Sequence, residues 1–128
     1  MENHLSSWSK FAEYTGLSEY ESKVYLTLVD LGVTGARKLS MACEVPRTKV
    51  YNTLKKLIDV GLVLEVPGKT KGFMAVAPEV SLKSNLLVIR KRAEEFESIV
   101  SSLTETYRHK QLSVEPQKVD IWIFQGRE

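Results

Sequence analysis

The sequence predicts a mainly α-helical fold with one small β-hairpin, an α+β class, followed by a single long helix. Three observations support this prediction. Apolar residues recur at spacings of three and four through residues 1–60, two short apolar segments flank a Pro-Gly turn at 67–68, and a heptad repeat runs through residues 82–107. A chain of 128 residues is long enough for one modest domain with an appendage.

The first helices are marked by their ends. Residues 5–14 read as a short helix that stops at Gly16. Ser18 followed by Glu21 predicts a capping box, in which each side chain accepts a hydrogen bond from an otherwise unpaired backbone N–H. The helix that this box opens should end at Gly32.

Two further helices are expected before the hairpin. Thr34 can cap a helix that holds residues 36–43. Pro46 suits the first turn of the next helix, because its missing N–H costs nothing there, and Gly61 is typical of the residue that follows a helix end. At about 100° per residue, one arc of this last helix is apolar and should dock on the preceding helices. The residues of this arc are Val50, Tyr51, Leu54, Leu57 and Ile58.

The hairpin follows directly. "LVLEV" (62–66) and "FMAVA" (73–77) read as strands, and "PGKTKG" between them reads as a turn. Lys69 and Lys71 lie at its tip, where apolar packing cannot explain them. Hairpin tips are often lysine-rich only because they are wet, so the tip is weak evidence by itself.

From residue 79 to 113 the chain reads as one long helix with a 3.5-residue apolar repeat, typical of a coiled coil. The alternative is a helix that packs back on its own domain; the strict repeat favours a homodimer. The orientation of the pair stays open, although a parallel pair would bring Arg92 toward Glu97 of its partner. The expected dimerisation residues are Leu82, Leu86, Ile89, Ala93, Phe96, Val100, Leu103 and Tyr107.

The charge of the chain is unevenly distributed. Residues 1–36 carry a net charge of −3, residues 73–128 are neutral, and residues 37–72 hold eight cations against three acids, a net of +5. A basic excess confined to one segment is expected of a surface that binds a polyanion.

The polar arc of the helix after Pro46 belongs to this basic segment. It is rich in cationic and amide side chains and holds one acid, Asp59, near its C-terminal end. A solubilising face usually mixes charges of both signs, so we favour a nucleic-acid-binding face over a merely solvated one. Arg47 and Asn52 can donate bidentately to base edges, and the other residues suit phosphates. The candidate DNA-binding residues are Arg47, Thr48, Lys49, Asn52, Lys55, Lys56, Lys69 and Lys71.

The parts of an enzyme site are not found in this sequence. His4, His109 and the single Cys43 offer no metal-ligand spacing, so we expect no metal or cofactor. "PGKTKG" lacks the spacing of a phosphate-binding loop and joins two strands. One cysteine forms no internal disulfide, and no apolar run is long enough for a bilayer. A cytoplasmic protein with no membrane association is therefore expected.

The segments "YESKVY" (20–25) and "VPRTKVY" (45–51), with the hairpin after them, resemble the winged helix-turn-helix domain of the TrmB family of transcriptional regulators, found chiefly in archaea. The resemblance covers about residues 10–80, and a long helix follows as it does in the family. It implies DNA binding by the helix after Pro46, with Arg47, Thr48, Lys49 and Asn52 in the matching positions, and dimerisation through the long helix. In longer members an effector domain, often for sugars, comes next. "VDIWIFQGRE" resembles the beginning of that domain and then stops. The sequence therefore leaves open which small-molecule effector is bound, if any, and whether the chain is truncated or naturally short.

We therefore expect a winged helix-turn-helix DNA-binding domain over residues 1–78, a coiled-coil dimerisation helix over 79–113, and a C-terminal strand within 114–128. The expected function is transcriptional regulation by a homodimer that binds specific double-stranded DNA. The alternative is a protein-interaction module that uses the same two parts without binding DNA. The operator sequence, and repression versus activation, cannot be read from the residues.

Overall fold

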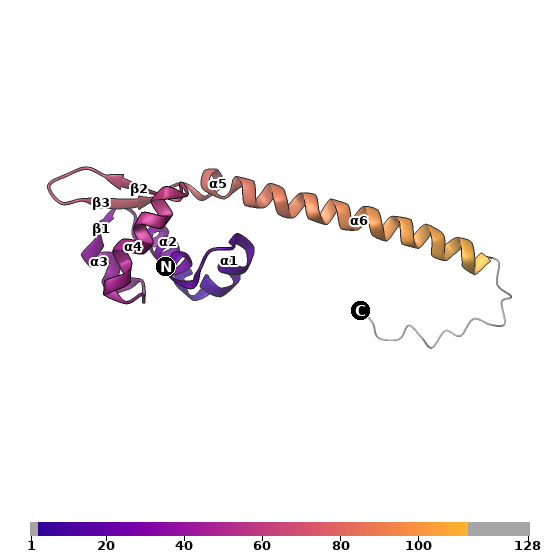
Figure 1. The fold of residues 1–128 in the computed structure, drawn as a ribbon, viewed down its shortest axis with the longest axis horizontal. Helices are drawn as coiled ribbons and strands as arrows, with labels where there is room; N and C mark the ends of the chain where they lie inside the picture. Colours follow the sequence, from indigo (N-terminus) through magenta and orange to yellow (C-terminus); the bar gives the residue numbers. More distant parts are fainter. Residues whose placement is uncertain (1–2, 113–128) are drawn as a thin grey trace. The chain divides into compact units, whose positions relative to one another are not determined.

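The computed structural model describes residues 3–112, and the strand expected near the C-terminus lies outside them (Figure 1). The chain divides into two compact units, one ending at Leu87 and one beginning at Val88. As predicted, the fold is mainly helical with a small antiparallel sheet and a long C-terminal helix. In chain order the elements are η1 (His4–Ser7), α1 (Trp8–Thr15), α2 (Glu19–Leu31), β1 (Thr34–Gly35), α3 (Ala36–Ala42), α4 (Arg47–Asp59), β2 (Val63–Val66), β3 (Gly72–Ala75), α5 (Pro78–Ser81) and α6 (Lys83–Leu112).

The capping box before α2 is confirmed. The hydroxyl of Ser18 accepts a hydrogen bond from the backbone N–H of Glu21 at 3.1 Å, and the Glu21 carboxylate accepts one from the N–H of Ser18 at 2.9 Å. Gly16 ends α1 with a left-handed backbone, φ +79°, which glycine adopts without the clash that a Cβ would bring. These two ends fix where α2, the central helix of the first unit, begins.

Thr34 does not cap α3, contrary to the prediction. It lies in the two-residue strand β1, its hydroxyl is buried, and Gly35 occupies the N-cap position without a side-chain hydrogen bond. Thr34 pairs with Phe73 and Gly35 with Gly72, which makes the expected hairpin the larger part of a three-stranded sheet. A pairing between residues this far apart in sequence leaves no local pattern by which to predict it.

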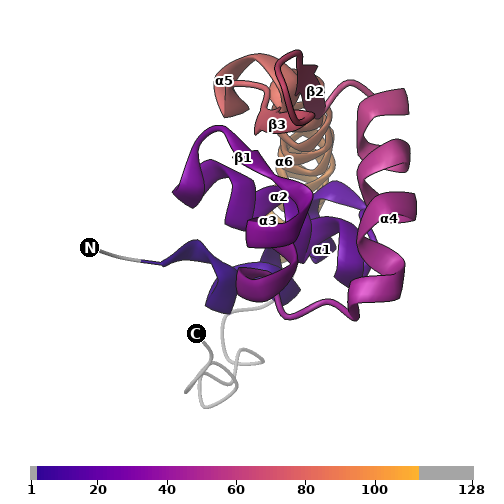
Figure 2. The ribbon, with the colours of Figure 1, turned by 90° about the vertical axis from the view of Figure 1, so that its left-hand side faces the viewer.

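The sheet has the strand order β1-β3-β2, and Figure 2 shows it at the top of the first unit, with α4 alongside. The predicted hairpin is confirmed, with Leu64 opposite Met74 in its register. Val63 and Phe73 turn toward the helices and are buried, whereas Leu64 is exposed on the other face. The sheet thus covers one end of a helical core and leaves the tip between β2 and β3 in solvent.

The C-terminal end of α4 is closed by a Schellman motif. Gly61 has φ +85° and donates its N–H to the carbonyl of Ile58 at 3.1 Å, while Leu62 donates to the carbonyl of Leu57 at 2.9 Å. Leu57 and Leu62 are both buried, so the apolar contact that accompanies this motif is present. Gly61 ends the helix as predicted, and the chain passes at once into β2.

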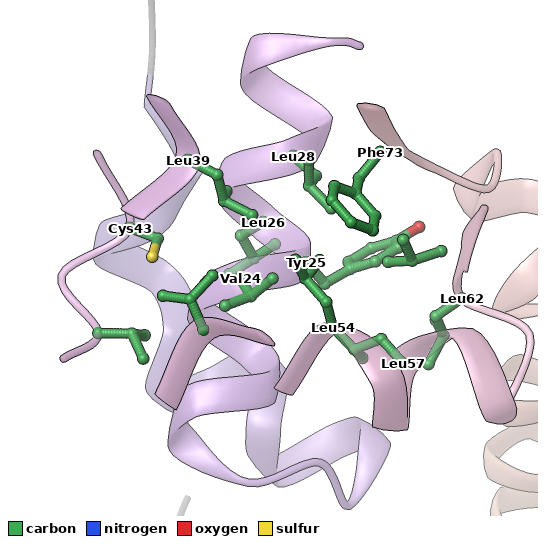
Figure 3. Packing of buried hydrophobic residues seen from close by; sticks show 13 residues of the cluster. Val24, Tyr25, Leu26, Leu28, Leu39, Cys43, Leu54, Leu57, Leu62 and Phe73 are labelled. Atoms are coloured by element: carbon green, nitrogen blue, oxygen red, sulfur yellow. The ribbon is translucent and has the colours of Figure 1, made fainter. Parts of the chain in front are cut away.

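Tyr25 joins the core to the segment that leads into the long helix (Figure 3). Its ring is buried and stacks on Phe11 at a centroid distance of 5.7 Å. Its hydroxyl lies 2.9 Å from the carbonyl of Val76, to which it donates, and 3.2 Å from the hydroxyl of Ser81. Burial raises the pKa of this hydroxyl, although the contact with Ser81 opposes the shift.

Cys43 also belongs to the core, as its spacing from Leu39 predicts. Its side chain is fully buried, and this burial raises the pKa of the thiol. A buried neutral thiol is a small apolar packing group rather than a nucleophile or a metal ligand. No cluster of metal-ligating side chains is found among residues 3–112.

The predicted long helix is interrupted near its start. The short helix α5 ends at Ser81, and the backbone of the next residue, Leu82 (φ −107°, ψ 8°), leaves the helical region before α6 begins at Lys83. Leu82 is partly buried against the apolar core of the first unit and lies just before the start of α6. No helix in the described part of the chain combines the length and apolar character that a bilayer crossing requires.

Candidate nucleic-acid interface

One side of helix α4 is buried in the core, and the opposite side is exposed to solvent. Val50, Leu54 and Leu57 are almost fully buried, and Thr53 completes this side while its hydroxyl donates to the carbonyl of Lys49 at 2.8 Å. Apolar contact with α2 fixes the rotation of α4 about its own axis. The polar residues predicted on the opposite arc are therefore directed outward.

The structure leaves all six candidate residues of α4 exposed, and they divide by their position around the helix. At about 100° per residue, Thr48 and Asn52 occupy the middle of the outward face. Lys49 lies on one flank, together with Lys56, and Arg47 lies toward the other. Within residues 3–112 none of the four cations of α4 forms an ion pair, so their charges are available to a partner.

The hairpin adds two cations, Lys69 and Lys71, which differ in whether an acid lies nearby. Lys69 is exposed in the turn between β2 and β3 and forms no ion pair within the described residues. The ammonium of Lys71 lies 3.6 Å from the carboxylate of Glu65 on the neighbouring strand, with both side chains about half exposed. An exposed pair of this kind is weak, but it offsets part of the positive charge of Lys71.

Three hollows line the surface where α3, α4 and the hairpin meet, and Tyr51 borders all of them. One lies between α3 and the hairpin tip, one between α3 and the start of α4, and one between α4 and the sheet. Four candidate residues line these hollows: Arg47, Asn52, Lys55 and Lys71. The other four, Thr48, Lys49, Lys56 and Lys69, are exposed elsewhere on α4 and on the turn.

Tyr51 was placed on the docking arc from its sequence, and that placement was wrong. Its side chain is 63% exposed, because the buried arc is centred on Val50 and Leu57, about 100° or more away around the helix. Thr53, a polar residue that the apolar pattern left out, is buried on the opposite flank of that arc instead. A helical wheel centred on the most regular i, i+4, i+7 series, Val50-Leu54-Leu57, would have shown it.

The structure also adds residues of α3 that were not among the candidates. The two cations among them were counted in the basic middle segment, but only the packing of α3 beside α4 brings all three residues to the same surface. They are Arg37, Lys38 and Met41, which line the hollow that Tyr51, Thr70 and Lys71 also border.

The apolar residues of α6 form the second candidate surface. Leu86, Ile89, Phe96, Val100, Leu103 and Tyr107 are all exposed, and no residue of the helix is buried. Ala93, at the remaining seam position of α6, is exposed as well. A heptad-spaced apolar row left in water is the surface that a coiled-coil partner would cover.

Comparison with known proteins identifies the family of this chain. The model of the family described as "Sugar-specific transcriptional regulator TrmB" matches residues 12–79. The chain is 30% identical over 114 residues to the HTH-type sugar sensing transcriptional regulator TrmBL1 of Pyrococcus furiosus, covering 88% of this chain and 31% of that protein. It is 30% identical over 105 residues to the DNA-binding HTH-type transcriptional repressor TrmBL2 of Thermococcus kodakarensis, covering 73% of this chain and 40% of that protein.

A solved structure of TrmBL2, described as an archaeal chromatin protein with a novel mode of DNA binding, superposes with a TM-score of 0.59 at 25% identity. The match covers 91% of this chain and 46% of that one. This chain thus spans between about a third and a half of the length of these three proteins. These relatives are named as regulators of transcription and not as enzymes. The chain belongs to the TrmB family of winged-helix transcriptional regulators.

Proposed function

We propose that this chain is a sequence-specific regulator that binds double-stranded DNA as a homodimer, with α4 in the major groove and the hairpin on the backbone or minor groove. The observation that carries the proposal is the outward face of α4, on which cations without ion pairs flank Thr48 and Asn52. A helix lying in a groove needs phosphate-binding charges at its flanks and hydrogen-bonding groups in the middle. Its relatives' DNA-binding and regulatory names support the same assignment.

The roles of the candidate residues follow from their positions. Asn52 is assigned to an adenine edge, and Arg47 is assigned to a guanine edge from the start of α4. Thr48 hydrogen-bonds to the backbone or to a base edge. The remaining candidates are assigned to phosphates and carry no sequence information by themselves: Lys49, Lys55, Lys56, Lys69 and Lys71.

The DNA-binding proposal is tested by selecting sequences from a random duplex pool and measuring affinity by fluorescence anisotropy. Arg47→Ala and Asn52→Ala should each lower the preference for the selected sequence over a scrambled one by about 1–3 kcal/mol, as expected for a lost bidentate base contact. Lys10→Ala is the control, because Lys10 is an exposed lysine on α1, which borders none of the three hollows. Absence of any DNA affinity at low salt would favour the protein-interaction module instead.

We further propose that α6 pairs with a second copy along its apolar row. Two copies of α4 related by a two-fold axis would then bind DNA half-sites about 34 Å apart, or a multiple of that distance. Sedimentation equilibrium of Phe96→Lys tests the seam, because a charge at its centre should dissociate the dimer. Ser98→Lys adds the same charge two residues away, off the seam, and should leave the mass unchanged. An unchanged mass for Phe96→Lys would remove α6 as the dimer interface.

A further inference from the structure

Tyr51 is an aromatic side chain in water at the centre of a basic surface. It is 63% exposed and borders the three hollows where α3, α4 and the hairpin meet. Arg47, one turn before Tyr51 on α4, borders one of these hollows, and Lys55, one turn after it, borders another. Packing within the chain therefore does not account for a large aromatic ring at this position.

Met41 repeats the pattern on the neighbouring helix. It is 78% exposed at the end of α3 and borders one hollow together with Tyr51, Arg37 and Lys71. Two apolar side chains from different helices thus face the same basic recess. Isolated exposed apolar residues are common on proteins, but a pair that shares a recess with three cations suggests a ligand that is anionic and also carries apolar groups.

Duplex DNA read through its major groove has both properties. Its phosphates supply the negative charge, and the 5-methyl of thymine is the one apolar group that its base edges present in that groove. Tyr51 lies about 100° around α4 from Asn52, the residue assigned to base edges, so its ring would approach the base edges from the flank of that contact. Lys55, on the same side of α4, would meet the flanking phosphates.

We propose that Tyr51 and Met41 contact thymine 5-methyl groups, so that this chain selects thymine at defined positions of each half-site. This inference rests on the proposed DNA-binding function and adds a specificity that the polar residues do not provide. Asn52 distinguishes base pairs by hydrogen bonds, whereas Tyr51 would distinguish thymine from a pyrimidine that has the same hydrogen-bonding edge and no methyl.

The test uses the duplex most enriched from a random pool by the full chain. Each thymine is replaced in turn by deoxyuridine, which removes the methyl and leaves the hydrogen-bonding groups unchanged. Burial of one methyl predicts a loss of about fourfold in affinity at the contacted thymines. Tyr51→Ala should abolish this loss at one of those positions and Met41→Ala at another. Tyr51→Phe should keep it, because the ring remains.

Tyr14→Ala serves as the control, since Tyr14 is a tyrosine of similar exposure, 57%, on α1. It should leave the dependence on thymine as in the wild type. Circular dichroism of each variant excludes unfolding as the cause of a loss. Equal affinity for every deoxyuridine duplex, or an unchanged pattern in Tyr51→Ala, would overturn the inference while DNA binding itself stands. If Tyr51→Phe lowers the affinity for the selected duplex as much as Tyr51→Ala does, the hydroxyl of Tyr51 contacts a phosphate. That result would also overturn the inference. Failure to select any duplex would overturn both proposals.

Discussion

Removal of the positive charge at Lys69 should flatten the salt dependence of DNA binding. The proposed DNA-binding surface offers eight cations on α3, α4 and the hairpin of each chain, counted from residue 37 to 72. If about five of them on each protomer reach phosphates, a dimer neutralises about ten, and log K falls against log salt with a slope near −9. Lys69→Ala removes one contact per protomer, so the slope should fall in size to about −7.

The difference is large enough to measure. A rise in salt from about 0.05 M to 0.2 M should weaken wild-type binding by about 10⁵-fold and the Lys69→Ala variant by about 10⁴-fold. Fluorescence anisotropy at several salt concentrations gives both slopes, and a scrambled duplex should show the same flattening because phosphates carry no sequence. Lys10→Ala should keep the wild-type slope. A Lys69→Ala slope equal to that of the wild type would place the hairpin tip away from the DNA backbone and refute this assignment.

Three further outcomes are expected. Glu65→Gln removes the carboxylate that lies 3.6 Å from Lys71, so it should strengthen binding to every duplex alike; a gain limited to the selected sequence would contradict this assignment. Tyr25→Phe leaves the carbonyl of Val76 without its donor and should lower the free energy of unfolding by about 1–3 kcal/mol in urea titrations. An unchanged free energy of unfolding would show that this hydrogen bond does not stabilise the fold. Cys43 should react with a thiol reagent only as fast as the protein unfolds. Rapid labelling of the folded chain would contradict a buried thiol. Because burial raises the pKa of Cys43, the stability that the neutral thiol contributes is complete at neutral pH and is lost as the pH rises past the ordinary pKa of a thiol.

Local signals predicted most of the first unit. The capping box of Ser18 and Glu21 and the stop at Gly61 depend on residues within a few positions of each other, and both are confirmed by hydrogen bonds. The hairpin was predictable for the same reason, since its turn and strands adjoin. The exposure of the six candidate residues on α4 followed from helical periodicity alone.

The predictions failed where tertiary contacts decide the structure. Thr34 has the side chain of a helix cap, but pairing with Phe73 draws it into a strand. Leu82 continues the heptad spacing, yet it lies at the break between α5 and α6 and is partly buried against the core of the first unit. Tyr51 is apolar in composition, but the rotation of α4 was set by better-spaced aliphatic residues. The part that Arg37 takes in the basic surface depended on the packing of α3 beside α4, which no local pattern reveals.

The link between α4 and β2 has a consequence for how this surface can evolve. Only residues 60–62 separate the helix from the strand, and Leu62 is hydrogen-bonded on both sides, to Leu57 through its N–H and to Val76 through its carbonyl. The offset between α4 and the hairpin is therefore fixed by this short, hydrogen-bonded link. Insertions and deletions should be tolerated in the turn at 67–71 and eliminated at 60–62. A deep mutational scan that accepts changes of length at both places equally would show that no such fixed offset is needed.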